Sequence, residues 1–426
     1  MHNSASFMGI HEWFEHYAST TPDKIACVFG NSNLTYFELN CRANFLAHLM
    51  IERGVSPGDV VAVAMTRSLE QVVAILAVLK AGAAYLPLDA TLSESRTHEW
   101  LEHANIKYTI VDQQWPVNIV DNFFREREYI NTADSELFMG RCEQNPAIPT
   151  SPERRAYVMY TRNSMGKPKA VMVPHRAVTH LVKNAKYIDF SSQDTLLQFS
   201  PLSHDASTFE IWGAWLNGGK LVLYPGRGIN RNLLAKVISD NGVSVCLLTA
   251  TLFNLVAKYH SDMLKTLRVL VVEGEMQPEL VKSVLEEYPL LTFVTGYGPT
   301  ENTAFTCCYS LSRENDVNAP YPIGKPIGET QLHILDSEKR PVMPGFPGEL
   351  YISGPGVALG YLNTTSDDFF VDPSIAEGLI YRTGDMVTQN AAGDVSLIKC
   401  CDDPIKLRGY HVSLKEMTQA VHAYRG

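Results

Sequence analysis

The sequence contains no run of about 20 apolar residues, so it predicts no membrane-spanning helix. It is also short of basic residues: 36 Lys and Arg stand against 46 Asp and Glu, which gives a net charge of −10. Nonspecific binders of nucleic acids or anionic membranes usually have the opposite balance. The first residues lack the basic start and apolar run of a secretory signal. We therefore expect a cytoplasmic protein whose partners include neither nucleic acid nor a membrane.

Metal-binding and redox motifs are missing as well. None of the eight cysteines forms a CxxC pair, and the adjacent pairs at 307–308 and 400–401 lack the spacing of metal ligands. Reduced, buried thiols are the expectation for such an arrangement. No GxxxxGK[ST] loop occurs, which excludes a Walker-type nucleotide site. What is present is a globular composition, with 45% hydrophobic and 19% charged residues over 426 positions, long enough for more than one compact unit.

Apolar segments of strand length alternate with helical patterns over the first three-quarters of the chain. Ile25–Phe29 and Val60–Met65 predict strands, and Ser68–Ala81 predicts a buried helix. Helices are also expected at Arg231–Asn241 and Pro278–Tyr288. Further strands are expected at Tyr108–Val111, Tyr157–Thr161, Val171–Val173, Leu221–Tyr224, Val243–Leu248 and Leu267–Val272. This alternation predicts an α/β fold with largely parallel sheets.

The pattern changes after about Thr303, where Gly and Pro become dense. Gln331–Leu335 and Glu349–Ser353 have the character of strands, and no helical pattern separates them. We therefore expect α/β units over about 1–302 and a small β-rich unit over about 303–401. Residues 113–156 carry only a weak pattern and are expected to form a surface connection.

A short loop at Tyr160–Ala170, YTRNSMGKPKA, follows an apolar strand and concentrates hydroxyl groups and lysines. Backbone amides in such a loop form an anion-binding nest, and Lys167 and Lys169 add positive charge. A polyphosphate is the ligand that suits this arrangement. Taken alone, the loop is explained about equally well as a polar turn with solvated lysines.

A second turn at Thr295–Glu301, TGYGPTE, follows the apolar strand Leu290–Val294. It exposes an aromatic ring, a hydroxyl and a carboxylate within five residues, at Tyr297, Thr300 and Glu301. An aromatic ring can stack on a purine, and a carboxylate beside phosphate can hold Mg²⁺. Because all three groups suit one nucleotide, an ordinary turn is the weaker interpretation.

The segment Tyr381–Asp385, YRTGD, places an acid after a glycine turn, where its two oxygens can accept from both ribose hydroxyls. A capping aspartate would be the better explanation if the segment stood alone. Together with the two preceding loops, however, the chain resembles the adenylation domains of nonribosomal peptide synthetases. The resemblance includes LTYFEL at 34–39, LKAGAAYLPLD at 79–89, SHDASTFEIWGAWLNGGKLVL at 203–223, GELYISGPGVALGYL at 348–362 and CDDPIKLRGYHV at 401–412, in the family's order.

The resemblance implies a fold and an activity. The fold is an adenylation core at 1–401, with two α/β subdomains of mixed or parallel sheets and a small β-barrel. A hinge and the start of a C-terminal lid, which is otherwise largely absent, follow at 402–426. The activity is the use of ATP and Mg²⁺ to convert an amino acid to aminoacyl-AMP, with release of pyrophosphate. A carrier protein with a phosphopantetheine arm then accepts the aminoacyl group, and an MbtH-like protein is a further candidate partner.

The resemblance also implies roles for individual residues. Glu301 is expected to bind Mg²⁺, and Asp402 is expected at the hinge. Tyr297 is expected to stack on adenine and Asp385 to bind the ribose. Catalysis and phosphate binding are expected at Thr161, Ser164, Lys167, Lys169 and Glu301. Nucleotide binding is expected at Gly274, Glu275, Gly296, Tyr297, Gly298, Thr300, Asp385 and Lys406.

The amino acid itself is expected to bind at the start of the helical segment after Ser203. Asp205 would hold its α-ammonium, although a helix N-cap also explains an aspartate there. The side-chain pocket would be lined by Ala206, Phe209, Leu247, Val271, Glu273, Gly296, Ala304 and Phe305. Most of these are apolar, which favours a valine-like aliphatic amino acid. Glu273 should be paired, protonated or turned away, or else it should meet a basic or polar substrate side chain.

The chain departs from the family pattern in its phosphate loop and before its hinge. The loop usually reads TSG(S/T)TGxPKG, whereas this chain has Arg162, Asn163, Met165 and Ala170 at four of these positions. Cys400 stands where the family has an arginine that contacts the nucleotide. These changes favour a second interpretation: an impaired adenylation domain that binds nucleotide or acts as a scaffold. An aminoacyl-tRNA synthetase shares the chemistry but would need a basic RNA-binding segment, which is missing.

Overall fold

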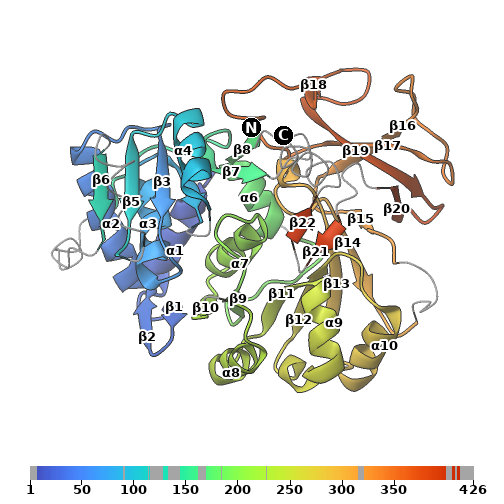
Figure 1. Cartoon of the computed structure of the whole chain (residues 1–426), viewed down its shortest axis with the longest axis horizontal. Helices are drawn as coiled ribbons and strands as arrows, with labels where there is room; N and C mark the ends of the chain where they lie inside the picture. Colours follow the sequence, from blue (N-terminus) through green and yellow to red (C-terminus); the bar gives the residue numbers. More distant parts are fainter. Residues whose placement is uncertain are drawn as a thin grey trace, which may run out of the picture.

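The computed structural model describes residues 7–89, 92–113, 115, 128–132, 144–161, 169–183, 185–226, 228–314 and 321–399, and the backbone of 405–407 and 410–412. In this part of the chain, two sheets that carry helices lie beside an antiparallel sheet formed by later strands (Figure 1). The α/β prediction is therefore confirmed. None of the helices described combines the length and hydrophobicity that a membrane span requires.

The first sheet has six strands in the order β6-β5-β3-β4-β7-β8. Its strands pair in parallel except at one edge, where β8 runs antiparallel to β7. One face is covered by α4 (Glu94–His103), which contributes Trp100 and Leu101 to the core on that side. The strands are β3 (Val60–Ala64), β4 (Ala84–Leu88), β5 (Tyr108–Val111), β6 (Glu128–Asn131), β7 (Arg155–Thr161) and β8 (Lys169–Pro174).

The second sheet has nine strands in the order β15-β14-β13-β12-β11-β9-β10-β1-β2. Pairing is parallel from β13 to β1, and antiparallel strands close both edges. The strands are β1 (Ile25–Phe29), β2 (Ser32–Thr35), β9 (Thr195–Gln198), β10 (Lys220–Leu223), β11 (Val245–Thr249), β12 (Val269–Glu273), β13 (Thr292–Tyr297), β14 (Cys307–Leu311) and β15 (Lys325–Pro326). Its outer face packs against α8 (Arg231–Asn241), η2 (Ser261–Leu264), α9 (Ala250–Tyr259) and α10 (Pro278–Glu287).

One continuous apolar core lies between the two sheets and contains five helices. Its central helix is nearly all apolar, as expected for a helix buried on every side. The Ser68 hydroxyl caps it by accepting from the Gln71 amide, so the helix predicted for Ser68–Ala81 begins one residue later and ends one residue earlier. The helices are α1 (Ile10–Thr20), α2 (Tyr36–Glu52), α3 (Leu69–Lys80), α6 (His175–Val182) and α7 (Ala206–Trp215).

Of the β-rich part expected over about 303–401, β14 and β15 belong to the nine-stranded sheet, whereas the later strands form a separate antiparallel sheet with the order β16-β17-β19-β18 and with β20 paired to β19. It stands above the nine-stranded sheet in the view of Figure 1. A two-stranded pair, β21 (Ile405–Leu407) and β22 (Tyr410–Val412), follows. The strands of the larger sheet are β16 (Gln331–Leu335), β17 (Gly348–Ser353), β18 (Phe369–Val371), β19 (Leu379–Gln389) and β20 (Val395–Lys399).

Two expectations from the sequence are wrong in detail. The weakly patterned segment 113–156 contains β6, a strand of the six-stranded sheet with Ile130 buried, and not only a surface connection. A four-residue edge strand is too short to give a clear period of two. Cys41 is disulfide-bonded, whereas Cys27, Cys246, Cys307 and Cys308 are the free thiols described. Spacing along the chain did not reveal this, because it does not report which cysteines meet in space.

Candidate active site

The turn after β13 is held in a tight conformation by its own backbone. A Cβ added at Gly298 would lie 2.5 Å from the carbonyl oxygen of Ala304, so only glycine fits there. Thr303 and Ala304 both have positive φ angles, 56° and 68°, which side-chain-bearing residues rarely adopt. The amide of Thr306 donates to the carbonyl of Tyr297 at 2.7 Å and closes the turn. Such local strain is common where a loop must present side chains to a ligand.

Replacing Gly298 with alanine should therefore disturb this turn. The added methyl group can be accommodated only if the backbone moves, so we expect a loss of about 1–3 kcal/mol in the free energy of unfolding and weaker nucleotide binding. Urea denaturation and calorimetry with AMP would measure both. Gly228→Ala is the matched control, because a Cβ there meets nothing within 4 Å. Equal stability of the two variants would contradict the expectation.

Glu301 lies in the one-turn η3 helix (Thr300–Asn302), and its side chain is buried. Its carboxylate Oε1 accepts a hydrogen bond from the Tyr361 hydroxyl at 2.8 Å. Burial raises the pKa of the Glu301 carboxyl above its ordinary value, and the bond from Tyr361 and the charge of Lys169 oppose that rise. A buried carboxylate close to a lysine suits a site that receives a cation together with an anionic ligand.

The phosphate-loop residues that the structure describes lie near Glu301. Thr161 at the end of β7 stands opposite Lys169 at the start of β8, and its hydroxyl donates to the Lys169 carbonyl at 3.4 Å. The Lys169 ammonium forms an ion pair with Asp368. Residues 162–168 between them, including Ser164 and Lys167, lie outside the described residues. Thr161 and Lys169 thus frame the position where the sequence predicts phosphate binding.

The expected Mg²⁺ needs suitable ligands among the described residues. No three His, Cys, Asp or Glu side chains in that part of the chain come close enough to hold a metal ion by themselves. Mg²⁺ usually binds through one or two carboxylates together with waters and substrate phosphates, so Glu301 fits as its protein ligand. The predicted role of Glu301 is therefore compatible with the donor set present.

Asp385 and Tyr297 meet at the junction of the nine-stranded and antiparallel sheets. The Tyr297 hydroxyl donates to Asp385 Oδ2. The YRTGD segment lies within β19, and Gly384, with φ of +76°, sits where the register of β19 against β17 shifts. This irregularity is typical of a β-bulge, which redirects a side chain. The ring predicted to stack on adenine and the carboxylate predicted to bind the ribose are therefore adjacent.

Asp205 lies at the N-cap of α7, as the alternative interpretation of the sequence had it. Its Oδ1 accepts from the Ala206 amide at 2.9 Å, and its Oδ2 accepts from the Thr300 hydroxyl at 2.5 Å. The second bond connects the helix to the turn that carries Glu301. Capping and ligand binding are compatible, because a carboxylate has more acceptor sites than these two bonds use.

The residues predicted to line the side-chain pocket come from α7, three neighbouring strands and the turn after β13. Leu247 on β11 lies beside Val271 on β12, and Glu273 lies beside Gly296 on β13. The ring of Phe305 fills the space over Gly296, where a Cβ would lie 2.4 Å from it. The structure therefore brings residues from distant parts of the sequence to one face of the sheet.

The remaining pocket residues complete this apolar surface. The rings of Phe209 and Phe305 lie 5.5 Å apart, and Ala304 is buried in the same core. Ala206 packs against that core. Glu273 at the end of β12 is exposed to solvent. This exposure is compatible both with a paired carboxylate and with one turned away from the pocket.

Other sequence predictions lie at the edge of the site or beyond the described residues. Gly274 and Glu275 are exposed in the connection from β12 to α10. Asp402 and Cys400 lie outside the described residues, as do the loop positions 162, 163 and 165, and the side chain of Lys406 is not described. Sequence reasoning missed Tyr361 and Asp368 as individual residues, although Tyr361 belongs to the quoted stretch 348–362.

Helix α7 also contains an acid whose ionisation should affect stability. Glu210 is buried, and it accepts from the Ser200 hydroxyl at 2.9 Å. Burial raises the pKa of Glu210 to about 7, despite the bonds from Ser200 and the charge of Arg67. The folded pKa exceeds the unfolded value of about 4.3, so the folded state binds more protons between these values. Stability should therefore fall as the pH rises through this window.

Replacing Glu210 with glutamine should remove that dependence. At about pH 8 the variant should be more stable than the unmodified chain, by on the order of 2–3 kcal/mol, and the difference should shrink toward about pH 5. Urea midpoints across this range measure it. The exposed Glu279 on α10 offers Glu279→Gln as a control that should follow the unmodified chain. If the stability of Glu210→Gln changed with pH as that of the unmodified chain does, the Glu210 carboxyl would not be the cause of the pH dependence.

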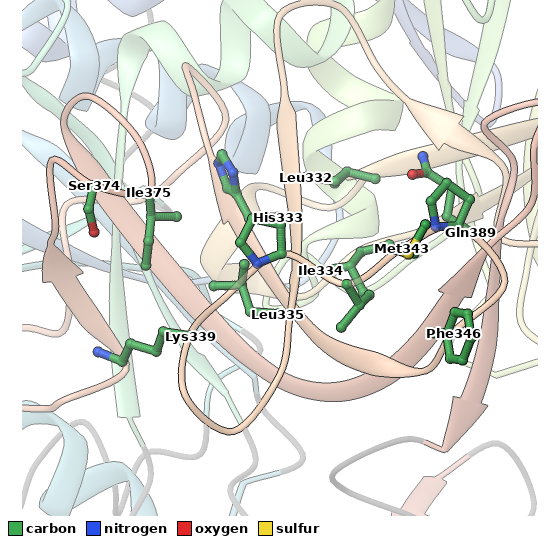
Figure 2. Close-up of a pocket in the computed structure, with 13 residues that line it drawn as sticks. Leu332, His333, Ile334, Leu335, Lys339, Met343, Phe346, Ser374, Ile375 and Gln389 are labelled. Atoms are coloured by element: carbon green, nitrogen blue, oxygen red, sulfur yellow. The ribbon is translucent and has the colours of Figure 1, made fainter.

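A cavity of about 240 Å³ lies elsewhere, on the antiparallel sheet (Figure 2). It is lined by β16, by the turn containing Met343 and Phe346, and by Gln389 on β19. None of its lining residues was predicted to bind the nucleotide or amino acid. The cavity is thus separate from the cluster around Glu301.

The profile of the family described as "AMP-binding enzyme" matches residues 14–362. This chain belongs to the AMP-binding enzyme family. The matched range includes Thr161, Asp205, Tyr297 and Glu301, whereas Asp385 lies beyond it. The matched range therefore includes the turn after β13, where the sequence predicts nucleotide binding.

Relatives of this AMP-binding enzyme include large peptide synthases. The chain is 37% identical over 426 residues to surfactin synthase subunit 2 of Bacillus subtilis, and 36% identical over 416 residues to tyrocidine synthase 3 of Brevibacillus parabrevis. Each match covers 96% of this chain but only 11% and 6% of the respective relatives. The chain thus spans a small fraction of the length of these proteins.

Solved structures show the same fold. One is the structure of holo-PA1221, an NRPS protein that contains adenylation and PCP domains. Its TM-score is 0.87 at 29% identity, and the match covers 97% of this chain and 72% of that chain. A second similar structure is the Klebsiella oxytoca NpsA N-terminal subdomain in complex with 3-hydroxyanthranilyl-AMSN. Its TM-score is 0.81 at 27% identity, and the match covers 92% of this chain and 99% of that chain. The fold of this AMP-binding enzyme is therefore that of nonribosomal peptide synthetase adenylation domains.

Proposed function

We propose that this chain activates an amino acid with ATP in the cytoplasm, as the adenylation core of a peptide synthetase. A carboxylate oxygen of the amino acid bonds to the α-phosphorus of ATP, and the bond from that phosphorus to the β-phosphate oxygen breaks. Aminoacyl-AMP forms and pyrophosphate leaves. Bound Mg²⁺ would neutralise charge on the phosphates, with Glu301 as its protein ligand. We also propose the division into a core at 1–401 and a hinge region at 402–426.

The observation that carries this proposal is the hydrogen bond from Thr300 to Asp205, 2.5 Å long. It joins the acid proposed to bind the α-ammonium to the turn that carries the phosphate-side carboxylate, Glu301. An amino acid held by its ammonium at Asp205 would present its carboxylate close to that turn. Fixing both reactants in this way supplies much of the rate gain in such a reaction.

The proposed substrate is a valine-like aliphatic amino acid. The apolar surface formed by Phe209, Leu247, Val271, Ala304 and Phe305 supports this choice, and so does the exposure of Glu273. A hydrophobic pocket separates substrates that differ by one methylene only by about 10- to 200-fold, so related aliphatic amino acids should also react.

The proposed acceptor of the aminoacyl group is the phosphopantetheine thiol of a carrier protein. The thiolate would attack the acyl carbon of aminoacyl-AMP, and AMP would leave. The holo-PA1221 structure, in which adenylation and PCP domains occur in one protein, supports this partner. An MbtH-like protein remains a further candidate partner, predicted from the sequence resemblance alone.

Amino-acid-dependent exchange of pyrophosphate into ATP tests the function directly. We expect weak exchange, little above background, with valine or a close aliphatic relative, and none with basic amino acids. A basic substrate would instead favour a role for Glu273, which Glu273→Gly would then abolish. No exchange with any amino acid, together with retained AMP binding, would favour the impaired domain that the departures at 162, 163, 165 and 400 suggest.

A further inference from the structure

A short segment, residues 358–362, connects the phosphate-loop strand to the turn that carries Glu301. The amide of Leu362 donates to the carbonyl of Ala170 on β8 at 2.7 Å. At the other end, the amide of Ala358 donates to the carbonyl of Glu301 at 2.9 Å. The backbone of this segment is thus fixed against both halves of the predicted phosphate site.

Tyr361 projects its side chain from this segment into a buried position. Its hydroxyl lies 2.8 Å from Glu301 Oε1 and 3.3 Å from Asp368 Oδ2. The Lys169 ammonium is paired with Asp368 and lies 4.6 Å from the centre of the Tyr361 ring. The ring packs edge-on against Phe369 at 5.1 Å. Tyr361 therefore contacts both Glu301, the expected Mg²⁺ ligand, and the ion pair between Lys169 and Asp368.

We propose that Tyr361 is a positioning residue for Mg²⁺-dependent ATP binding. Its hydroxyl holds the Glu301 carboxylate in one orientation for the cation. Its ring keeps the Lys169–Asp368 pair beside that carboxylate. This inference rests on the proposed function, and it adds a residue that acts through Glu301 without itself touching the nucleotide.

The described residues offer the cation few protein ligands. When one carboxylate carries most of the protein's share of the binding, its orientation determines how well the cation and phosphates bind together. Hydrogen-bond partners that orient metal ligands change metal affinity by about 10- to 100-fold when removed. The fixed backbone of 358–362 and the packing against Phe369 keep the Tyr361 hydroxyl in place for this task.

Tyr361→Phe removes the hydroxyl and keeps the ring, so its packing and its contact with Lys169 persist. Calorimetric titration of ATP at a series of Mg²⁺ concentrations gives the Mg²⁺ midpoint for ATP binding. We expect this midpoint to rise by about 10- to 100-fold in the variant. AMP binding without metal should stay within about twofold, and its stoichiometry reports the fraction of correctly folded sites.

Tyr351→Phe is the matched control. The Tyr351 hydroxyl also donates to a glutamate, Glu349, at 2.9 Å, but on β17 away from the phosphate loop. Its Mg²⁺ midpoint should equal that of the unmodified chain. An unchanged midpoint in Tyr361→Phe, with AMP sites intact, would overturn the inference and leave the proposed function standing. If the unmodified chain bound ATP independently of Mg²⁺, or not at all, the proposed function itself would fail.

Discussion

Replacing Asp205 with alanine should nearly abolish amino-acid binding while AMP binding persists. The carboxylate is the group proposed to pair with the α-ammonium, and the nucleotide contacts proposed for Tyr297 and Asp385 do not include it. Removing one partner of a hydrogen-bonded charge pair costs about 2–5 kcal/mol, so affinity should fall by about 30-fold or more. Calorimetry with the best amino acid from the exchange panel, and separately with AMP, measures the two effects.

Asp205→Asn separates the charge from the helix cap. Asparagine caps helices about as well as aspartate, so it should keep the bond from the Ala206 amide and the stability of α7. It should still lose most of the amino-acid affinity, because an amide carries no charge for the ammonium. If either variant bound the amino acid normally, Asp205 would be a helix cap alone, and the proposed amino-group site would be wrong.

Replacing Glu301 with glutamine should lower amino-acid-dependent pyrophosphate exchange by about 10²–10³-fold. Glutamine keeps an oxygen that can accept from Tyr361, so the buried packing survives, but it offers no negative charge to Mg²⁺. AMP binding without metal should change little. Initial exchange rates at saturating Mg²⁺ and valine, or the amino acid identified in the panel, provide the measurement.

The matched control for this variant is Glu349→Gln. Glu349 is paired with Arg382 on β19 and accepts from Tyr351, so it occupies a comparable polar setting outside the site. Its exchange rate should stay close to that of the unmodified chain. If Glu301→Gln were as active as Glu349→Gln, Glu301 would not be part of the phosphate site. The family assignment would be unaffected.

The strongest local patterns predicted their elements well. The bounds expected for Ile25–Phe29, Arg231–Asn241 and Gln331–Leu335 are those of β1, α8 and β16. Each of these segments either shows its apolar period in full or is marked at its ends by cap residues, as Asn230 and Gly242 mark α8. The edge strand β6 was missed because its four residues contain little of any period. Sheet order was not predicted, because it depends on which strands pair after crossovers.

For the site, the sequence by itself determined the α/β character and the glycine-containing segments that carry Tyr297, Glu301 and Asp385, although Tyr297 ends strand β13 and Asp385 lies inside strand β19 and not in the expected turn. These are properties of neighbouring residues along the chain, where period and turn chemistry act. Only the tertiary structure decided which side chains meet. Tyr361 reaches Glu301 across 60 positions, Tyr297 reaches Asp385 across 88, and Thr300 reaches Asp205 across 95. Such contacts depend on the order and register of the sheets, which no local pattern encodes.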